Sequence, residues 1–408
     1  MIGRRCALFA LGILLILVLG VNVYFIRMMV ESSSSQRIYA RNALEPNARQ
    51  DQFTPSRSNE KNSQLQLRPI VRGIGEKLKE EIRTLPSKYF KQNTSYVLVL
   101  ERLLAELRIM SNVREDIWNI PNNKWPDAHQ LIPPVAPELG TVLEVLRRSN
   151  VVRADNAPLG TQLKLMLDLE NGVRALFKPR WRSLNFLLIE DRILIVDLME
   201  EIHNRATPEL YATMYQEGND TCLYGVCHYC SPADPVCGTG NMLEGALIFW
   251  LPRYLKLVKD SKAYSPQSSN RLLDLIDTAI FDFLMDNGDR HHYELAQSNF
   301  HNPAVLLIDN GKSLGNPDVD HLDILAPLYQ CCMIHKTTWD RLRLFSGGSL
   351  SAALSRLLEH EAEMSNVAPL ITVEHLSAMD RRLLTIYGVV ESCLKKEKYA
   401  SNVILDHR

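Results

Sequence analysis

The pattern of apolar and polar residues begins with one long hydrophobic stretch. Residues 6–26 are almost all apolar, and roughly 20 such residues are enough to cross a bilayer as a helix. Arg4 and Arg5 precede this stretch and Arg27 follows it. Because no clean small-residue cleavage site ends it, we expect residues 1–27 to form a cytoplasmic tip and a signal anchor rather than a cleaved signal peptide. The rest of the chain would then lie in the lumen.

The pattern then turns polar, helical and finally alternating. Residues 28–72 are rich in Ser, Asn, Gln and Arg, which predicts a flexible stem. The apolar spacing in YVLVLERLLAELRIM, residues 96–110, predicts a helix. Leucines at alternate positions over residues 163–169, followed by an Asn-Gly pair and VRALF, predict a β-hairpin. The second strand of this hairpin would end at Lys178.

The second half of the chain is mostly helical in pattern. Residues 271–287 carry one apolar stripe, and Gly288 can stop the helix there. AVLLID, residues 304–309, predicts a short strand that ends in an acid. Helical spacing also covers residues 322–335, 348–364 and 377–398.

The order of strand-rich and helix-rich segments predicts an α+β fold with two lobes. Residues 73–247 would form an N-terminal extension and a β-rich lobe, and residues 248–408 a helical lobe. A hydrophobic content of 46% is enough for a sizeable core. Lys plus Arg number 46 against 47 Asp plus Glu, so no basic field points to nucleic acid.

The cysteines are clustered along the chain. Outside the apolar stretch, which contains Cys6, they stand at positions 222, 227, 230, 237, 331, 332 and 393. In a lumenal compartment such clusters indicate disulfides, although the spacing alone also allows a zinc site. Seven is an odd number, so one thiol is free, pairs between chains or has lost its partner. Asn93 and Asn219 begin sequons, which are compatible with secretion and glycosylation.

The segment FLMDNGDRHHYE, residues 283–294, concentrates polar groups after the predicted helix. Asp289 is followed five residues later by Glu294, and Asp309 then precedes Asn310-Gly311. Protein kinases have a catalytic acid and two metal-binding residues in this order. Asp289 fits the residue that receives and orients the attacking hydroxyl. Asp309 and Glu294 fit oxygen ligands of a divalent ion.

Three further features bear on the interpretation as a kinase site. A lysine from a preceding hairpin would neutralise phosphate charge, and Lys178 is placed for that role. His291 and His292 could suggest zinc, but adjacent histidines point apart on a regular backbone, so we expect them to set the loop. The chain has no Gly-x-Gly-x-x-Gly and no Walker loop, which excludes a close match to an ordinary protein kinase.

Several motifs together resemble one family. GTQLK, FKP, CLYGVCHYC, DRHHYE, LDILAPLYQCC and HLSAMDRRLL are similar to the secretory-pathway kinases that include the Golgi casein kinase and the glycosaminoglycan xylosylkinase. The resemblance implies an atypical two-lobed protein-kinase-like fold in the Golgi lumen that uses ATP with Mn²⁺ or Mg²⁺. It also implies disulfides that pair Cys222 with Cys237, Cys227 with Cys230, and Cys332 with Cys393.

The resemblance also implies roles for individual residues. Asp289 would be the catalytic acid, Asp309 would bind metal and nucleotide, and Glu294 would support them. The ATP contacts would come from Gln162, Lys178 and, with a weaker claim, Lys164. The hinge strand against adenine would be Ile248, Phe249, Trp250 and Leu251.

The Cys227-x-x-Cys230 spacing, APLYQCC and TTW resemble the xylosylkinase branch of the family. This branch phosphorylates the 2-hydroxyl of xylose in the linkage region of proteoglycans. Trp339 could offer a flat face to a sugar ring or belong to the core. A lumenal Ser/Thr protein kinase is the rival enzyme, and a pseudokinase that activates a related kinase partner is the non-catalytic rival.

Two stretches are shorter than the family pattern. Between Lys178 and Cys222 the family has a helix whose acid pairs with the lysine, and NFLLIEDRIL, with Glu190 and Asp191, could be its remnant. Between residues 252 and 271 a second stretch is missing, which the family uses to supply a cysteine. Its loss would leave Cys331 without a partner. The sequence leaves open a shortened splice form, a faulty gene model or a divergent, weak kinase.

Overall fold

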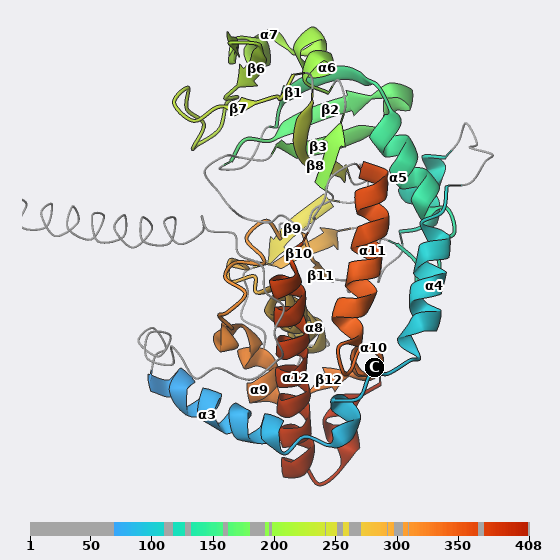
Figure 1. The fold of residues 1–408 in the computed structure, drawn as a ribbon, viewed down its shortest axis with the longest axis vertical. Helices are drawn as coiled ribbons and strands as arrows, with labels where there is room; N and C mark the ends of the chain where they lie inside the picture. The colour runs from blue at the N-terminus through green and yellow to red at the C-terminus, as the bar shows by residue number, and fades with distance from the viewer. Residues whose placement is uncertain are drawn as a thin grey trace, which may run out of the picture. The chain divides into compact units, whose positions relative to one another are not determined.

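The computed structural model describes most of the chain after the predicted stem (Figure 1). The described residues are 69–109, 117–126, 132–157, 162–179, 192–195, 198–240, 242–250, 256–260, 271–291, 293–297, 305–308, 310–365 and 371–406. The predicted signal anchor lies outside them. Within these ranges no helix is both long and apolar enough to cross a membrane.

A five-stranded sheet forms the β-rich part of the structure, in the order β1-β2-β3-β8-β4. Its strands are β1 (Val151–Asn156), β2 (Leu165–Leu169), β3 (Arg174–Pro179), β4 (Arg192–Ile195) and β8 (Leu243–Phe249). The predicted hairpin is confirmed, because β2 pairs antiparallel with β3 from Leu165 opposite Phe177 to Asp168 opposite Arg174. Alternate side chains of β3 are buried, and in β2 every residue except Asp168 is buried.

The turn of this hairpin is the three-residue segment Glu170–Gly172. Gly172 has a φ of +74°, a conformation that glycine adopts without a steric penalty. Leucine side chains of β2 pack with α5 (Leu139–Arg148) and α6 (Leu198–Arg205) in one hydrophobic core.

Two sequence predictions about this lobe need correction. The hypothesis that NFLLIEDRIL is the remnant of a helix fails for its last three residues, because residues 192–195 form strand β4, which pairs antiparallel with β8, while Glu190 and Asp191 lie outside the described residues. The β-branched sequence of β4 favours a strand, and β8 offers an edge for pairing. The predicted lobe boundary at residue 248 falls inside β8, because β8 stays paired with β3 up to Phe249.

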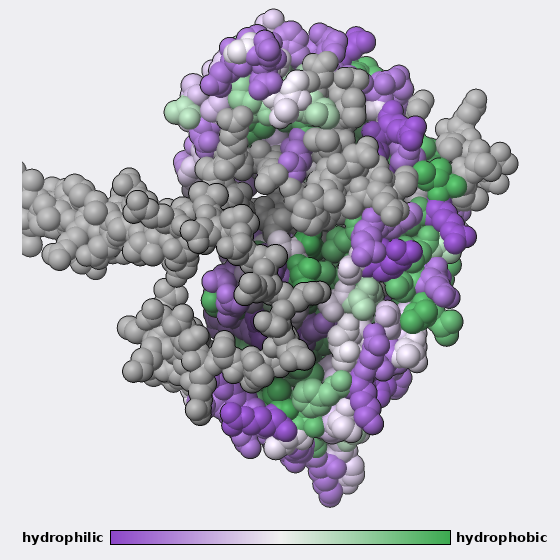
Figure 2. Space-filling model, viewed as in Figure 1, coloured by the Kyte–Doolittle hydropathy of each residue, from purple (hydrophilic) through white to green (hydrophobic). Residues whose placement is uncertain are grey.

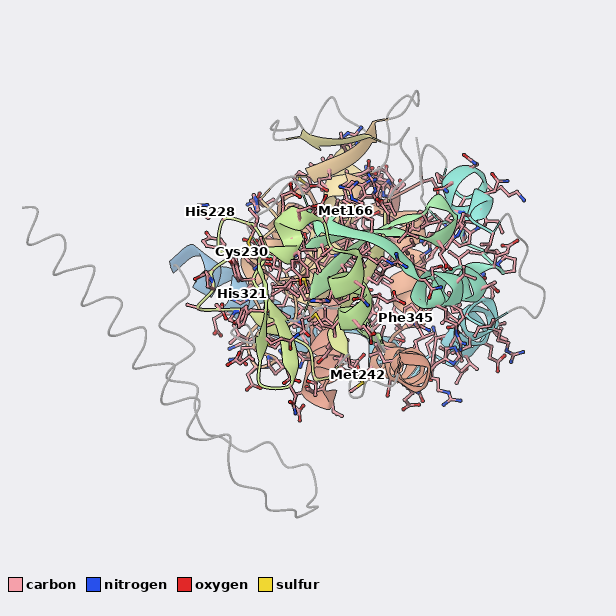
Figure 3. All side chains as sticks on the ribbon, turned by 90° about the horizontal axis from the view of Figure 1, so that it is seen from above. Met166, His228, Cys230, Met242, His321 and Phe345 are labelled. Atoms are coloured by element: carbon pink, nitrogen blue, oxygen red, sulfur yellow. A yellow bond between two sulfur atoms is a disulfide. The ribbon has the colours of Figure 1, made fainter. Side chains whose placement is uncertain are left out.

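A small disulfide-bonded sheet follows helix α7 (Pro208–Tyr211). Its strands are β5 (Met214–Glu217), β6 (Asp220–Leu223) and β7 (Val236–Cys237). Cys222 and Cys237 lie opposite each other in register and are bonded, and Cys227 is bonded to Cys230. Figure 3 shows His228 and Cys230 on the loop after β6. Asn219, a predicted glycosylation site, is exposed at the β5–β6 turn.

The helical part is built around two buried helices, α8 (Arg271–Met285) and α12 (Val373–Lys396). The predicted helix over residues 271–287 is thus confirmed to within two residues. Around it lie η4 (Leu322–Leu325), α9 (Ala326–Cys331), β12 (Ile334–His335), α10 (Lys336–Leu344), α11 (Ser349–Ser365), η5 (Ala400–Asn402) and β13 (Ile404–Leu405). The disulfide Cys332–Cys393 joins the end of α9 to α12.

The predicted helix over residues 322–335 is too long. Cys332 has a φ of +51°, which stops α9, and Ile334 and His335 then pair in parallel with β13. Trp339 on α10 is 4% exposed and packs edge-to-face on Tyr387 with ring centroids 5.8 Å apart. Trp339 therefore belongs to the core, and a sugar does not have access to its face in this structure.

The N-terminal extension packs on helices of the C-terminal part. Helix α3 (Pro69–Arg83) contacts α12, and α4 (Tyr96–Glu106) contacts α11. The predicted stem therefore ends too late, since α3 begins at Pro69, where proline suits a first helical turn. Short helical turns lie at η1 (Ser87–Tyr89) and η2 (Ile120–Lys124). Apolar side chains reach the surface around α4, at the right of Figure 2, where Leu98 is 74% exposed.

Candidate active site

The C-terminal end of α8 starts the candidate site. Asp286 takes a φ of +56°, so the helix ends there and not at Gly288 as predicted. The backbone N–H of Leu314 donates to the Met285 carbonyl over 2.7 Å, which satisfies one of the groups left open at a helix end. The residues after Asp286 turn away from the helix, and Asp289 stands on this turn.

A three-stranded sheet follows the turn, with β10 (Tyr293–Gln297) between β9 (Lys256–Asp260) and β11 (Val305–Leu306). Glu294 lies opposite Leu306 in the β10–β11 pair and is partly buried. Asp309, the predicted metal ligand three residues after Leu306, lies outside the described residues. Tyr293 is partly buried beside Glu294, and this burial raises the pKa of its phenol.

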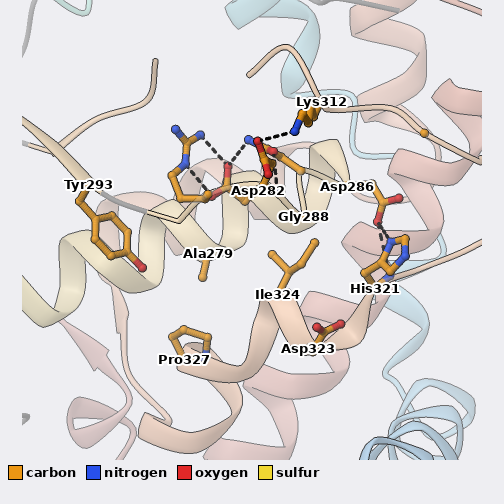
Figure 4. A pocket seen from close by; sticks show the side chains of 14 residues that line it. Ala279, Asp282, Asp286, Gly288, Tyr293, Lys312, His321, Asp323, Ile324 and Pro327 are labelled. Carbon is orange, nitrogen blue, oxygen red and sulfur yellow. Dashed lines mark hydrogen bonds and ion pairs between the residues drawn. The ribbon is translucent and has the colours of Figure 1, made fainter. Parts of the chain in front are cut away.

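A cavity of about 600 Å³ opens between this turn and the η4–α9 segment (Figure 4). Acidic, basic and apolar groups share its wall, which suits a polar ligand with some apolar surface. The lining residues are Ala279, Asp282, Asp286, Asn287, Gly288, Asp289, Arg290, Tyr293, Lys312, Gly315, His321, Asp323, Ile324 and Pro327.

The acids of this cavity differ in how far they are already neutralised. Asp282 is 2% exposed and binds Arg290 through both carboxylate oxygens. Asp286 is 4% exposed and accepts from His321 Nδ1 over 3.1 Å. The Asp289 side chain is 47% exposed, and one of its oxygens lies 3.0 Å from Lys312 Nζ. Asp289 is therefore the acid of these three that an incoming hydroxyl can reach.

Loop contacts hold Asp289 in place. Its backbone N–H donates to Asn287 Oδ1 over 3.2 Å, and its carbonyl lies 2.6 Å from His291 Nδ1. The prediction that the histidines set the loop is confirmed for His291, while His292 lies outside the described residues. Among the described residues, the one possible metal group, Glu217 with Cys222 and Cys237, contains a disulfide, so its sulfurs are not zinc ligands.

The predicted nucleotide contacts lie on the five-stranded sheet. Lys178 is partly buried in β3 opposite Ala246 of β8, and Gln162 and Lys164 come just before β2. Ile248 and Phe249 end β8, Trp250 follows and is 41% exposed, and Leu251 lies outside the described residues. Among the predicted site residues that the structure describes, Asp289 is the one that lines the cavity. The convergence of Lys178, Glu294 and Asp309 on it stays a prediction.

The structure also places residues in the cavity to which sequence reasoning assigned no role: Asp286, Arg290, Lys312, His321, Asp323. Arg290 stands within the DRHHYE motif itself, and Lys312 directly follows Asn310-Gly311. These two basic residues, each next to one of the acidic motifs, could have been predicted as part of the site from the sequence. Asp323 stands within the LDILAPLYQCC motif, whereas His321 lies outside the quoted motifs and reaches the end of α8 only through the fold.

The family model for the Golgi casein kinase C-terminal domain, Fam20, matches residues 116–192, 187–257 and 253–402. These stretches cover well over half of the chain. The chain belongs to the Fam20 family. The breaks between the stretches fall in the two regions where the sequence is shorter than the family pattern. Strand β4 begins at the first break, and β9 lies at the second.

Curated Fam20 relatives match along most of their length. The chain is 36% identical to the glycosaminoglycan xylosylkinase homolog of Drosophila melanogaster, over 80% of this chain and 89% of the relative. It is 33% identical to the glycosaminoglycan xylosylkinase of Homo sapiens, over 72% and 85%. Identity to the human extracellular serine/threonine protein kinase FAM20C is 30%, over 64% of this chain and 55% of that one.

Solved Fam20 structures have the same fold. The structure of hydra Fam20 with sugar is 30% identical, with a TM-score of 0.61 over 72% of this chain and 99% of that one. The Golgi casein kinase with Mn/ADP bound, at 21% identity, has a TM-score of 0.60 over 86% and 96%. The chain therefore has the predicted protein-kinase-like fold. All three implied disulfides are present, and Cys331 is free, with a pKa that burial raises.

Proposed function

We propose that this chain is an ATP-dependent kinase that phosphorylates the 2-hydroxyl of xylose in the glycosaminoglycan–protein linkage region and so promotes proteoglycan biosynthesis. Two xylosylkinase relatives at 36% and 33% identity, matched over more than four fifths of their length, support this substrate. The observation that carries the chemistry is the half-exposed carboxylate of Asp289 at the mouth of the cavity.

Asp289 would accept a hydrogen bond from the attacking sugar hydroxyl and orient it toward the phosphate. The cavity wall formed by η4 and α9 offers His321 and Asp323 as hydrogen-bonding groups beside the apolar Ile324 and Pro327 (Figure 4). A sugar presents both kinds of surface, so this wall supports a glycan acceptor.

The carboxylates predicted to meet Asp289 are of the kind that a hard divalent ion prefers. Carboxylate oxygens are the ligands that Mn²⁺ and Mg²⁺ take, and Glu294 and Asp309 would hold the ion. When bound, the ion would supply positive charge at the phosphates. Gln162, Lys164 and Lys178 would bind ATP, whose adenine would lie against Ile248, Phe249, Trp250 and Leu251. A Golgi casein kinase of the same fold binds Mn/ADP, which supports this choice of cofactors.

We also place the enzyme in the Golgi membrane as a single-pass type II protein. The apolar residues 6–26 would form the anchor, and the three disulfides support a lumenal, oxidising location for the catalytic part. Glycosidase treatment tests this placement, because a shift in mobility that Asn219→Gln abolishes requires exposure to the lumen. Asn93 is the weaker sequon, since its side-chain amide donates to the Arg343 carbonyl over 3.0 Å.

The decisive test offers the full chain ATP, Mn²⁺ and one of two acceptors, a galactosyl-xyloside or an acidic peptide. We expect transfer to the xylose 2-hydroxyl, and loss of transfer in Asp289→Asn and Asp309→Ala. Asp340→Asn, which changes a partly exposed acid on α10, serves as the control. Transfer to the peptide alone would instead support the lumenal Ser/Thr protein kinase.

A second candidate, a pseudokinase that activates a related kinase partner, is favoured by one feature. The first element described after β3 is strand β4, and helix α6 follows it, whereas the resemblance leads us to expect a helix after Lys178 whose acid pairs with this lysine. Pseudokinase FAM20A of Homo sapiens is a relative at 30% identity over 58% of this chain. This candidate requires that the wild-type chain transfers no phosphate but stimulates a related kinase.

A further inference from the structure

The side chain of Arg290 joins three segments of the candidate site. Its Nε and Nη2 donate to the two oxygens of Asp282 on α8 over 2.9 and 2.8 Å. Its Nη1 donates to the Ile308 carbonyl, and its Nη2 also donates to Asn310 Oδ1 over 2.6 Å. Arg290 itself belongs to the turn that carries Asp289. One guanidinium thus connects the helix, the turn and the segment after β11.

The burial of this contact separates it from an ordinary surface ion pair. The side chain of Arg290 is 12% exposed and that of Asp282 is 3% exposed. A buried acid needs a partner, and Asp282 has both oxygens engaged by the planar fork of the guanidinium. A lysine could not reproduce this geometry, because its ammonium is a single point of charge.

The two residues that Arg290 contacts beyond Asp282 have a special place in the sequence. Ile308 and Asn310 stand on either side of Asp309. Asn310 is fixed further, because its Nδ2 donates to the Leu307 carbonyl over 2.9 Å. The neighbours of Asp309 are thereby held at a set distance from the turn of Asp289.

Arg290 is already saturated by these contacts, unlike Lys312. Lys312 is 54% exposed, and its ion pair with Asp289 can exchange for a ligand. Arg290 would have to leave a buried carboxylate to meet a phosphate. Its role is therefore to hold protein segments together.

We propose that Arg290, anchored by Asp282, is a positioning residue that fixes the separation between the Asp289 turn and the backbone on both sides of Asp309. This inference rests on the proposed function, because it concerns the same metal–nucleotide site. Groups that orient metal ligands without touching the metal commonly change metal affinity about 10- to 100-fold when removed. The expected defect is thus in metal-dependent nucleotide binding, before any chemical step.

Calorimetric titration of the full chain with ADP, with and without Mn²⁺, tests the inference. We expect Arg290→Lys to weaken Mn²⁺-dependent ADP binding about 10- to 100-fold and to leave metal-free ADP binding unchanged. Asn310→Ala, a smaller change that removes one acceptor, should weaken the same binding in the same direction. Arg381→Lys is the matched control, since Arg381 also contacts a carboxylate and a carbonyl, those of Asp320 and Pro317.

The outcomes are distinct. If both variants lose only the Mn²⁺-dependent part of ADP binding and the Arg381→Lys control is unchanged, the positioning role is supported. Wild-type affinity in Arg290→Lys and Asn310→Ala overturns it, and so does an equal loss of metal-free ADP binding, which indicates a general structural defect. If Arg290→Lys does not fold, Asn310→Ala decides. If the wild-type chain binds no ADP with Mn²⁺, the proposed function fails and the inference falls with it.

Discussion

Replacing Arg382 with leucine would remove a fully buried guanidinium from helix α12. Its side chain is 0% exposed, and Nε donates to Asp320 Oδ1 over 2.8 Å. Its other nitrogens donate to the carbonyls of Leu284 and Val319 over 3.2 and 3.1 Å. Asp286 Oδ2, on a side chain that is 1% exposed, lies 3.5 Å from Nη2. The substitution leaves the buried Asp286 carboxylate without this cation and removes the donors of the Leu284 and Val319 carbonyls, while Asp320 keeps its contact with Arg381.

The magnitude follows from that burial. Breaking a buried ion pair by removing one partner costs about 3–5 kcal/mol, because the remaining charge stays out of water. For a domain of this size, such a loss lowers the melting temperature by about 4–7 °C. The neighbouring Arg381 gives a matched comparison, because it binds the same Asp320 but its side chain is 44% exposed. Arg381→Leu should cost no more than about 1 kcal/mol.

Thermal unfolding of the two variants, followed by tryptophan fluorescence with the disulfides intact, measures this difference. The reasoning predicts a clearly larger shift for Arg382→Leu than for Arg381→Leu. Equal shifts would refute it, because both variants lose a contact to Asp320 and differ mainly in burial.

Three further predictions concern other parts of the fold. Removing the Cys332–Cys393 disulfide, which closes a separation of 61 residues, should cost about 4 kcal/mol in the chain-entropy account, measured by unfolding of the double serine variant. Gly245→Ala should weaken ATP binding and lower the melting temperature, because its Cβ would lie 2.4 Å from a ring atom and 2.5 Å from a carbonyl of β3. Burial lowers the pKa of His335, but the hydrogen bond to Asp277 outweighs it, so the pKa is raised. The stability that protonated His335 contributes is fully present below its pKa in the unfolded chain, about 6.5, and is lost as pH rises through its pKa in the folded protein. The His335→Gln variant should lack this pH-dependent change in melting temperature.

The sequence predicted the elements whose pattern is long and regular. The β2–β3 hairpin was predictable because alternating leucines meet an Asn-Gly turn, and α8 because its apolar stripe repeats over four turns. The order of acids around Asp289 was predictable because kinase chemistry constrains it. The disulfide pairs came from the family resemblance, since spacing alone also allowed zinc.

Element ends were less predictable, because distant residues decide them. Gly288 was expected to stop α8, but the N–H of Leu314 caps Met285 and Asp286 takes the left-handed conformation. The end of α9 at Cys332 likewise depends on β12 pairing with a strand near the C-terminus. Such contacts leave no local pattern in the sequence, so helix propensity does not predict them.

The distribution of charge in the cavity distinguishes Asp289 from the two buried acids, Asp282 and Asp286. Asp282 is held by Arg290, and Asp286 is held by Arg382 and contacted by His321, so both carboxylates are already engaged by groups from other parts of the fold. Asp289 has an exposed partner, Lys312, which a phosphate can draw away at little cost. Leu314, two residues after Lys312, caps the end of α8 through its backbone N–H. An insertion between Lys312 and Leu314 should therefore disturb the cation and the helix end together, whereas an insertion in the exposed β5–β6 turn should leave both unchanged.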